Sequence, residues 1–464
     1  MERPAKMIPP TATTRPAGGW SQELRAMLAL AWPMALTNLS QIALVVTDTL
    51  FLSRLGEIPL AAATLGGNLY FIAMSLPFGL AFAATAMMAQ EKGRVRGHMR
   101  EMRRTIRQAM WLGLLAFIPI ALALWHSAAI LRATGQDPAL AAAAQTFVRA
   151  MMWGLLPFYG FMLLRGFLSA LERPRAALWV SLAAIGLNAL LDYVLVMGGF
   201  GGPALGVLGA GLASATSNLC MFLGLAALIA TGRRTARFRL AGRFWRTDWR
   251  RMAEIVWIGL PIAGTMLLEI GVFSGTALVM GWFGPGAVAA HAVALQVASS
   301  TFMIPMGISQ AATARVGLAA GAADIPGIRR AGWAAIGLAA AFMVAMAGLL
   351  VTLPTQLAAL FLPPELESTR RLAVTLLMVA GLFQLADGVQ VAAAGALRGL
   401  KDTRMPLFFA ALGYWGLGLP VGMALGFTAG MGPIGVWFGL ASGLAVVAVL
   451  MTLRWRRLSA LPVS

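Results

Sequence analysis

Four carboxylates stand in long apolar segments, where a charged side chain persists only if it has a partner or a function. They are Asp48, Asp192, Glu269 and Asp387. A carboxylate at the centre of a membrane helix costs about 2.5–3.5 kcal/mol on an insertion scale. Low-dielectric surroundings favour the neutral acid, so such a group can hold and release a proton. With amide or carbonyl oxygens added, the same group can bind a hard cation such as sodium.

The acids of the first half of the chain should gather near the outer ends of their helices. Asn188 stands four residues before Asp192, so both side chains lie on one helical face. Asp48 stands at a similar depth in the membrane on another helix. We expect Asp48, Asn188 and Asp192 to form one polar cluster, which Thr216 could join as a lining residue.

The acids of the second half, Glu269 and Asp387, stand near the middle of their segments. Gln384 and Gln390 are close to Asp387 in sequence, so these four could form a second cluster and line a substrate cavity. If sodium is the coupling ion, Glu269 and Asp387 are its predicted ligands. His291 is a further cavity candidate, although packing explains a single buried histidine more readily than a proton relay does.

Composition identifies the kind of protein that holds these acids. Of 464 residues, 59% are hydrophobic and only 11% are charged, whereas a soluble chain carries about 25% charged residues. The chain is therefore an integral membrane protein. A single cysteine, Cys220, excludes an internal disulfide, and the three histidines are too far apart for a local metal motif.

The formal charge of +19 need not indicate nucleic acid, because basic residues gather in the cytoplasmic loops of membrane proteins. We expect no nucleic-acid partner. The chain has no glycine-rich phosphate loop ending in Gly-Lys, so ATP is not expected as a direct energy source. No cofactor beyond a coupling ion is expected.

Twelve apolar segments can be counted, the fourth spanning residues 147–170. The connections after even-numbered segments are basic, above all residues 91–107 and 231–251. All basic loops share one side only if the number of spans is even, with both termini in the cytoplasm. Arg165 and Arg398 stand near that side, where we expect their side chains to snorkel to the interface.

The chain also repeats itself at one constant offset. The same offset relates four pairs: Pro33 and Pro261, Gly56 and Gly284, Pro77 and Pro305, Gly79 and Gly307. A six-helix unit used twice inserts both copies in one orientation, so the relating axis runs along the membrane normal. The predicted fold is an all-α integral membrane protein, with twelve transmembrane helices in two six-helix bundles related by a pseudo-two-fold axis.

These patterns divide the chain into five parts. We expect a disordered cytoplasmic tail (1–22), a first lobe (23–231), a basic cytoplasmic linker (232–251), a second lobe (252–454) and a second cytoplasmic tail (455–464). Such a design suits alternating access, in which two bundles rock about a central site.

Several short motifs together resemble one known family. They are Thr47-Asp48-Thr49, Leu187-Asn188, Leu191-Asp192-Tyr193, Gly259-Leu260-Pro261, Ala289-Ala290-His291, Gln310-Ala311-Ala312-Thr313, Asp387-Gly388-Val389-Gln390 and Lys401-Asp402-Thr403-Arg404. The chain is similar here to multidrug and toxic compound extrusion (MATE) transporters of the NorM type. The matches spread over nearly the whole chain, and the block from Asp387 to Arg404 is the most specific.

The resemblance implies an antiporter that exports cationic and amphiphilic drugs against an inward flow of sodium or protons. Its cation sites correspond to Asp48, to Asn188 with Asp192, and to Glu269 with Asp387. It implies a multi-pass protein of the cell inner membrane, for which we expect a monomer. One departure is Ala292, where this branch often has glutamine, and this weakens any prediction of a polar drug contact there.

The sequence also allows three other functions to be compared with transport. A flippase for lipid-linked precursors would need a basic cavity for its anionic substrate, whereas the deep charges here are acidic. A membrane-embedded enzyme lacks support, because no nucleophile–base spacing is present. A channel is disfavoured by the internal repeat with unpaired acids, which is typical of a carrier.

Overall fold

The protein is helical throughout the part that is described, and that part shows no β-strand. The structure is a computed structural model that describes residues 19–94, 97–240, 242 and 244–460. It contains twelve helices long and apolar enough to cross a membrane, as the sequence predicts. Helices suit this environment because each satisfies its own backbone hydrogen bonds. Residues 1–18 of the expected N-terminal tail and residues 461–464 lie outside the described part.

The helices follow one another along the chain with short connections. The spans of the first half are α1 (Trp20–Ser53), α2 (Glu57–Gly93), α3 (His98–Trp125), α5 and α6 (Pro138–Met151 and Leu155–Ala170), α7 (Arg175–Leu195) and α8 (Val207–Thr231). The second half has α9 (Trp249–Gly281), α10 (Pro285–Gly321), α11 (Ile325–Thr352), α13 (Glu367–Gly399), α14 to η5 (Arg404–Thr428) and α16 (Gly432–Leu458). Short helices α4 (Ser127–Ala133) and α12 (Pro354–Ala359) lie in two of the connections.

The fourth span is longer than its apolar segment. It begins at Pro138 rather than at residue 147. The added stretch is rich in alanine, the best helix former, and proline suits the first helical position. The Asp137 side chain caps this start by accepting hydrogen bonds from the amides of Ala139 and Leu140 at 2.9 and 3.0 Å.

The internal repeat is visible in matching backbone geometry. Gly56 and Gly284, one of the repeat pairs, both have positive φ (114° and 101°) in the turns after α1 and α9. Residues other than glycine rarely adopt such backbone angles. Thr37 donates to the Pro33 carbonyl at 2.7 Å, and its counterpart Thr265 makes the equivalent bond at 2.9 Å. Equivalent positions therefore fold alike in both halves.

The two halves meet through close helix contacts that obey the same symmetry. A side chain at Gly79 of α2 would begin 2.8 Å from the Ala263 Cβ of α9, and one at Gly307 of α10 would begin 2.8 Å from the Ala35 Cβ of α1. The repeat offset relates each partner in one contact to its counterpart in the other. Small residues let backbones approach closely, so these contacts hold α1 against α10 and α2 against α9.

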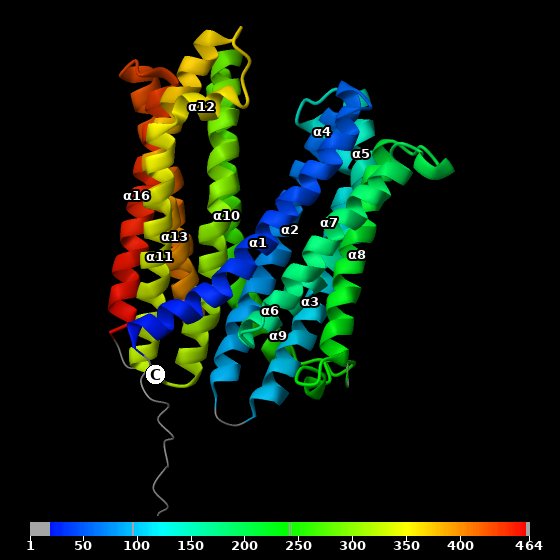
Figure 1. The fold of residues 1–464 in the computed structure, drawn as a ribbon, viewed down its shortest axis with the longest axis vertical. Coiled ribbons are helices and arrows are strands. Elements are labelled where there is room, and N and C mark those ends of the chain that lie inside the picture. The colour runs from blue at the N-terminus through cyan, green and yellow to red at the C-terminus, as the bar shows by residue number, and fades with distance from the viewer. Residues whose placement is uncertain (1–18, 95–96, 241, 243, 461–464) are drawn as a thin grey trace, which may run out of the picture.

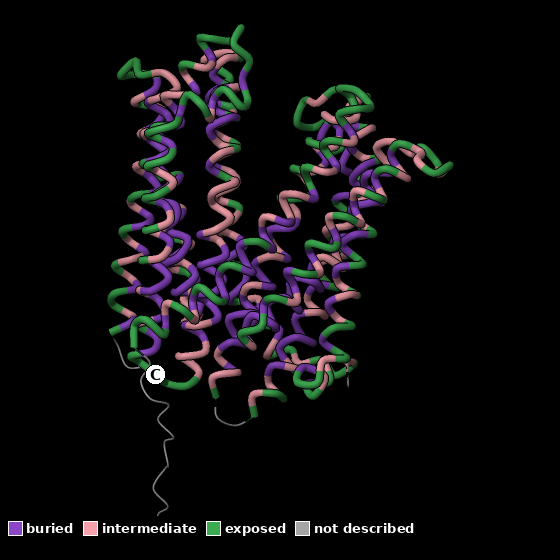
Figure 2. The backbone as a smooth tube through the Cα atoms, in the orientation of Figure 1, coloured by how far each residue is buried: buried purple, intermediate pink, exposed green. Residues whose placement is uncertain are grey.

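The halves converge toward the end that carries the basic loops and spread apart toward the other end (Figure 1). Buried residues gather where the halves converge (Figure 2). Toward the other end the same interface helices expose large apolar side chains, among them Val45 (62%), Leu50 (59%) and Leu278 (74%). The structure is therefore closed at the basic-loop end.

Candidate functional site

A polar cluster joins three helices in the first half. Asn188 of α7 donates to Asp48 Oδ1 of α1 at 2.6 Å and to Asp192 Oδ2, one turn along its own helix, at 2.9 Å. Ser214 of α8 donates to Asp48 Oδ2. The structure thus brings together Asp48, Asn188 and Asp192, as the sequence predicts.

Glycines bring α8 close enough to complete this cluster. A side chain at Gly209 would strike the Leu195 carbonyl of α7, and one at Gly211 would begin 2.6 Å from the Phe147 carbonyl of α5. Close approach of α8 to both neighbours carries Ser214 to Asp48. Thr216, the predicted lining residue, is exposed on another face of α8. Ser214, two positions earlier, is the α8 residue that contacts Asp48 instead of the predicted Thr216. The helical periodicity decides which of the two hydroxyls faces the cluster.

The first cluster is almost closed to its surroundings. Asp48 is 8% exposed, Asn188 1% and Asp192 0%. Asn188 Oδ1 and Asp192 Oδ1 have no hydrogen-bond donor in the described structure. Two carboxylates bridged by one amide repel each other when both are charged, and burial strengthens that repulsion. The arrangement is therefore suited to hold one proton or one small cation.

A second cluster lies in the other half. Asp387 of α13 is 6% exposed and lies close enough to Glu269 of α9 for their charges to repel. Gln384 and Gln390, at 1% and 4% exposure, stand one turn to either side of Asp387. Several oxygens and nitrogens of these side chains have no partner in the described structure: Asp387 Oδ1, Gln390 Oε1, and Gln384 Oε1 and Nε2. Buried polar atoms of this kind are rare unless a ligand or water satisfies them.

Sequence reasoning missed Tyr414 in this second cluster. Its ring is 2% exposed, and it lies within electrostatic range of both Glu269 and Asp387. Tyr414 belongs to η4 (Ala411–Gly418), a π-helical stretch, and such stretches are frequent at functional sites. The sequence could have indicated Tyr414 only by the rarity of its residue type, since the chain has four tyrosines.

His291 lies in an aromatic contact rather than in an acid cluster. Its Nδ1 accepts a hydrogen bond from the Trp437 indole at 3.1 Å, and the two rings meet edge to face. Trp437 in turn meets Phe383, the neighbour of Gln384. Nδ1 accepts, so the proton of the neutral ring is on Nε2, which is buried without a partner in the described structure. Among the described residues no hydrogen bond joins His291 to an acid.

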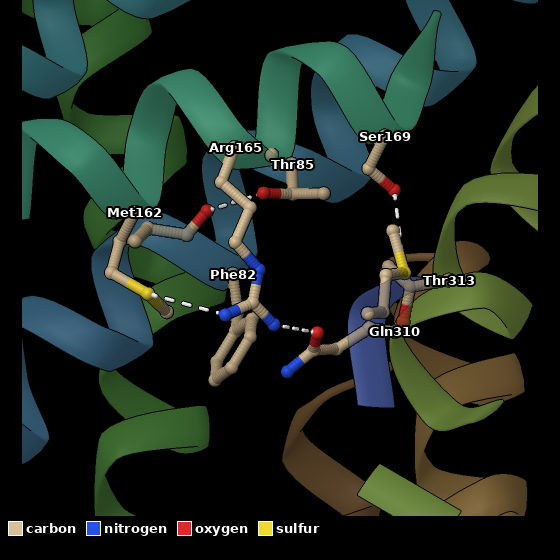
Figure 3. A pocket seen from close by; sticks show the side chains of 10 residues that line it. Phe82, Thr85, Met162, Arg165, Ser169, Gln310 and Thr313 are labelled. Atoms are coloured by element: carbon tan, nitrogen blue, oxygen red, sulfur yellow. Dashed lines mark hydrogen bonds between the residues drawn. The ribbon is translucent and has the colours of Figure 1, made fainter. Parts of the chain in front are cut away.

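Arg165 does not snorkel, contrary to the expectation from its position in the sequence. It is 4% exposed and lies between the halves, where it donates to Asn38 Oδ1 of α1 at 2.7 Å and to Gln310 Oε1 of α10. Figure 3 shows it pointing at Gln310 across a small cavity. Arg398 likewise stacks on Phe82 of α2, 4.8 Å from the ring centre. Both arginines turn inward because the opposite half offers an amide oxygen to Arg165 and an aromatic ring to Arg398.

Ion pairs cross between the halves at the same end. Arg315 of α10 pairs with Glu23 of α1, at 2.9 Å for one of its nitrogens, and also with Glu172. Arg251 of α9 pairs with Glu91 of α2 at 3.0 Å. These contacts join the helices that the glycines bring together. They add to the closure of the basic-loop end.

The chain is similar to one family over most of its length. The MatE family profile matches residues 33–194 and 261–424, two ranges that start at the repeat pair Pro33 and Pro261. "Probable multidrug resistance protein NorM" of Mesorhizobium japonicum is 48% identical over 445 residues, 95% of each chain. The protein of the same name from Brucella suis is 45% identical over 448 residues, 96% of this chain and 95% of that one.

Solved structures share the fold at lower sequence identity. The crystal structure of the eukaryotic MATE transporter AtDTX14 has a TM-score of 0.82 and 22% identity, and covers 95% of this chain and 98% of that one. The outward-facing conformation of a multidrug resistance MATE family transporter of the MOP superfamily has a TM-score of 0.84 and 20% identity, covering 94% and 96%. These likenesses concern the arrangement of the helices.

Proposed function

The chain belongs to the MATE (MatE) family, and from that membership we propose that it exports cationic and amphiphilic drugs in exchange for protons or sodium ions. It is a multi-pass membrane protein and a multidrug efflux transporter of the NorM type, not an enzyme. We place it in the cell inner membrane with the basic loops and both termini in the cytoplasm, following the charge of the loops.

The observation that carries the coupling proposal is the pair of buried acid clusters, one in each half. Asp48 and Asp192 share one amide donor, and Asp387 faces Glu269. Each cluster has carboxylate oxygens without donors in the described structure. A proton or a sodium ion would remove the repulsion within either pair. We assign coupling to these four acids and to Asn188.

The drug is assigned to the space between the halves, reached from the end where they spread apart. An acidic, largely apolar lining favours a cation with apolar groups. Gln384 and Gln390 are the cavity residues we propose for the second half, with His291 as a further candidate and with Glu269 and Asp387 as the coupling acids beside them. Neutralising an acid pair would weaken its attraction for a cationic drug. Release toward the outside then accompanies ion entry.

Alternating access requires that the ion favour one state over the other, since equal affinity would shift nothing. In the state described, the basic-loop end is held closed by Arg165, by the ion pairs of Arg315 and Arg251, and by the glycine contacts. Opening toward the cytoplasm must break these contacts. The ion supplies the difference in free energy when it binds the outward state more tightly.

The test is transport by the purified chain in lipid vesicles loaded with a fluorescent organic cation. A pH gradient and a sodium gradient are imposed separately, each with the other held at zero. We expect one of them to drive transport against the drug gradient. Transport that follows only the drug's own gradient under both conditions would refute antiport. Counterflow of labelled drug distinguishes a carrier, which shows it, from a channel.

A further inference from the structure

A second cavity lies on the first half, at the basic-loop end and away from both acid clusters. It has a volume of about 510 Å³ and lies between α1, the end of α6, the start of α7 and the end of α8. One wall is apolar and includes Ala29, Leu168 and Leu228. Its rim carries Arg173 and Arg175. Cavities of about 300–1,000 Å³ are typical of small-molecule sites.

The rim of this cavity is positively charged. Arg173 and Arg175 are both exposed, and within the described structure neither forms an ion pair with an acid. Arg175 lies over the Trp32 ring of α1 at 5.8 Å from its centre. The one acid of the rim, Glu172, is already paired with Arg315 of the other half. The two rim arginines therefore keep their charge for a ligand.

Further arginines stand next to lining residues along the chain. Arg233 and Arg234 directly follow Gly232, which lines the cavity, and both are exposed. Arg25 stands one helical turn before Ala29 on the same face of α1. The site thus offers fixed positive charge on several elements, which suits an anion with more than one oxygen.

The apolar wall continues onto surface that faces lipid. Leu228 of α8 is 49% exposed and Trp32 of α1 is 43% exposed. Leu228 stands near the end of α8, and the Trp32 ring lies beside Arg175 at the start of α7, so both are on the basic-loop side. An indole at that level is typical of the membrane–water interface. A ligand that fits both parts has an anionic head and an apolar tail.

We propose that this cavity binds the headgroup of an anionic phospholipid from the leaflet on the basic-loop side. The phosphate lies between Arg173 and Arg175, and the acyl chains run along the apolar surface of α1 and α8. Basic pockets between membrane helices on the cytoplasmic side recognise anionic headgroups by this chemistry. The site is separate from the transport acids, and the inference does not depend on which ion drives transport.

The experiment measures binding of short-chain lipids to the full chain in a non-ionic detergent, by the rise in Tm and by lipid adducts in native mass spectrometry. The probes are dihexanoyl phosphatidylglycerol, dihexanoyl phosphatidylcholine and inorganic phosphate. The test variant is Arg173→Gln with Arg175→Gln. The matched control is Arg456→Gln with Arg457→Gln, which removes two exposed charges at the same end, on α16.

We expect phosphatidylglycerol to bind the unaltered chain and the control alike, and to bind the test variant at least tenfold more weakly. Phosphatidylcholine, which has no net charge, should bind less well than phosphatidylglycerol to the unaltered chain. Equal losses in test and control variants would mean diffuse surface attraction and would overturn the proposal. Equal binding of inorganic phosphate and phosphatidylglycerol would overturn it too, since the ligand would then be free phosphate.

A second variant tests the same cavity in case the arginine variant does not fold. Ala29→Trp fills the apolar wall and leaves every charge in place. We expect it to weaken phosphatidylglycerol binding at least tenfold while drug transport in vesicles of neutral lipid stays unchanged. Full lipid binding by this variant would show that the cavity is not the site.

Discussion

Arg165 of α6 donates a hydrogen bond to Gln310 of α10, and this bond crosses between the two halves of the molecule. The same guanidinium donates to Asn38 of α1. Within the described structure Arg165 has no acidic partner, and its buried charge is stabilised by the two amide oxygens and by the Met162 sulfur at 4.0 Å. The arrangement exists only while the halves are in contact at the basic-loop end, which makes Arg165 a reporter of that closed state.

Replacing Arg165 with methionine should open this end more often. Gln310 Oε1 would lose its donor, at a cost of about 1–3 kcal/mol for a buried acceptor left unsatisfied, while Asn38 Oδ1 would keep the Gln310 amide at 3.5 Å. The thiol of Thr85→Cys reports the change, because Thr85 is 8% exposed and lines the same cavity (Figure 3). With Cys220 replaced by serine, a water-soluble maleimide should label residue 85 at least about fivefold faster in the Arg165→Met variant.

The control for this labelling experiment is Arg250→Met, which removes an exposed arginine at the same end. It should leave the labelling rate of Thr85→Cys unchanged. If Arg165→Met and Arg250→Met label at one rate, the interhalf hydrogen bonds do not hold the closed state.

Gly321→Ala should impair closure by a different route. A methyl group at Gly321 of α10 would strike the Gln90 carbonyl of α2, a backbone atom that cannot turn aside. Overpacking of this kind costs about 1–3 kcal/mol. Gly67→Ala on α2 is the matched control, because nothing lies within 4 Å of its new methyl group. We expect slower efflux and a lower Tm for Gly321→Ala only; equal effects of both changes would contradict the role of this contact.

Asp387→Asn should reduce ion-driven efflux at least about tenfold while the protein still inserts, because an amide cannot exchange a proton or neutralise a cation. Asp48→Asn tests the first half in the same way. Asp324→Asn is the control, since this exposed side chain caps the start of α11 away from both acid clusters, and asparagine caps equally well. Transport in vesicles under the effective gradient is the measurement. Wild-type rates in Asp387→Asn would remove this residue from the mechanism.

The fold could be read from the sequence because its main determinants are local. Twelve apolar segments predict the spans, and prolines and glycines at one offset predict the repeat. The sidedness that the basic loops indicate stays a prediction. The acids of the first cluster were predictable for the same reason, since Asn188 and Asp192 share a face of one helix. The shortage of other intramembrane charges made them conspicuous.

The remaining site residues depend on how helices face one another, which the sequence does not state. Ser214 and Thr216 differ by two positions on α8, and only packing against α1 decides that the serine reaches Asp48. Arg165 looked like a snorkelling residue because its acceptor, Gln310, belongs to the other half of the chain. Tyr414 reaches the second cluster from a π-helical stretch that periodicity does not reveal.

Substitutions at Ser214 and Thr216 can therefore show which hydroxyl of α8 acts on Asp48. Ser214→Ala removes the hydroxyl that donates to Asp48, and Thr216→Ala removes an exposed hydroxyl two positions on. Loss of a hydrogen bond to a charged group is worth about 1.5–3 kcal/mol. We expect Ser214→Ala to change the ion concentration for half-maximal efflux about tenfold or more, and Thr216→Ala to leave it unchanged. The reverse order would place the working hydroxyl at Thr216.

Asp248, just before α9, gives the molecule a pH-dependent contact outside the membrane-spanning segments. Its carboxylate accepts from the Arg251 amide at 3.1 Å and pairs with Arg104 of α3. Burial alone would raise the pKa of Asp248, but the hydrogen bonds and charges of Arg104 and Arg251 outweigh it and hold that pKa below its ordinary value. The charged form therefore stabilises the fold above the unfolded pKa of about 3.9, and this contribution is lost as the pH falls through the lower folded value.

Asp248→Asn isolates this effect, because asparagine still caps the helix. The variant should unfold at a lower Tm than the unaltered chain from about pH 8 to about pH 5. The loss in free energy of unfolding should be no more than about 1 kcal/mol, because the pair is partly exposed to solvent. Below about pH 4 the difference in Tm should shrink, since the aspartate is then losing its charge. The measurement is thermal unfolding in detergent, followed by tryptophan fluorescence. A difference that grows as the pH falls would mean that the pKa of Asp248 is raised on folding rather than lowered.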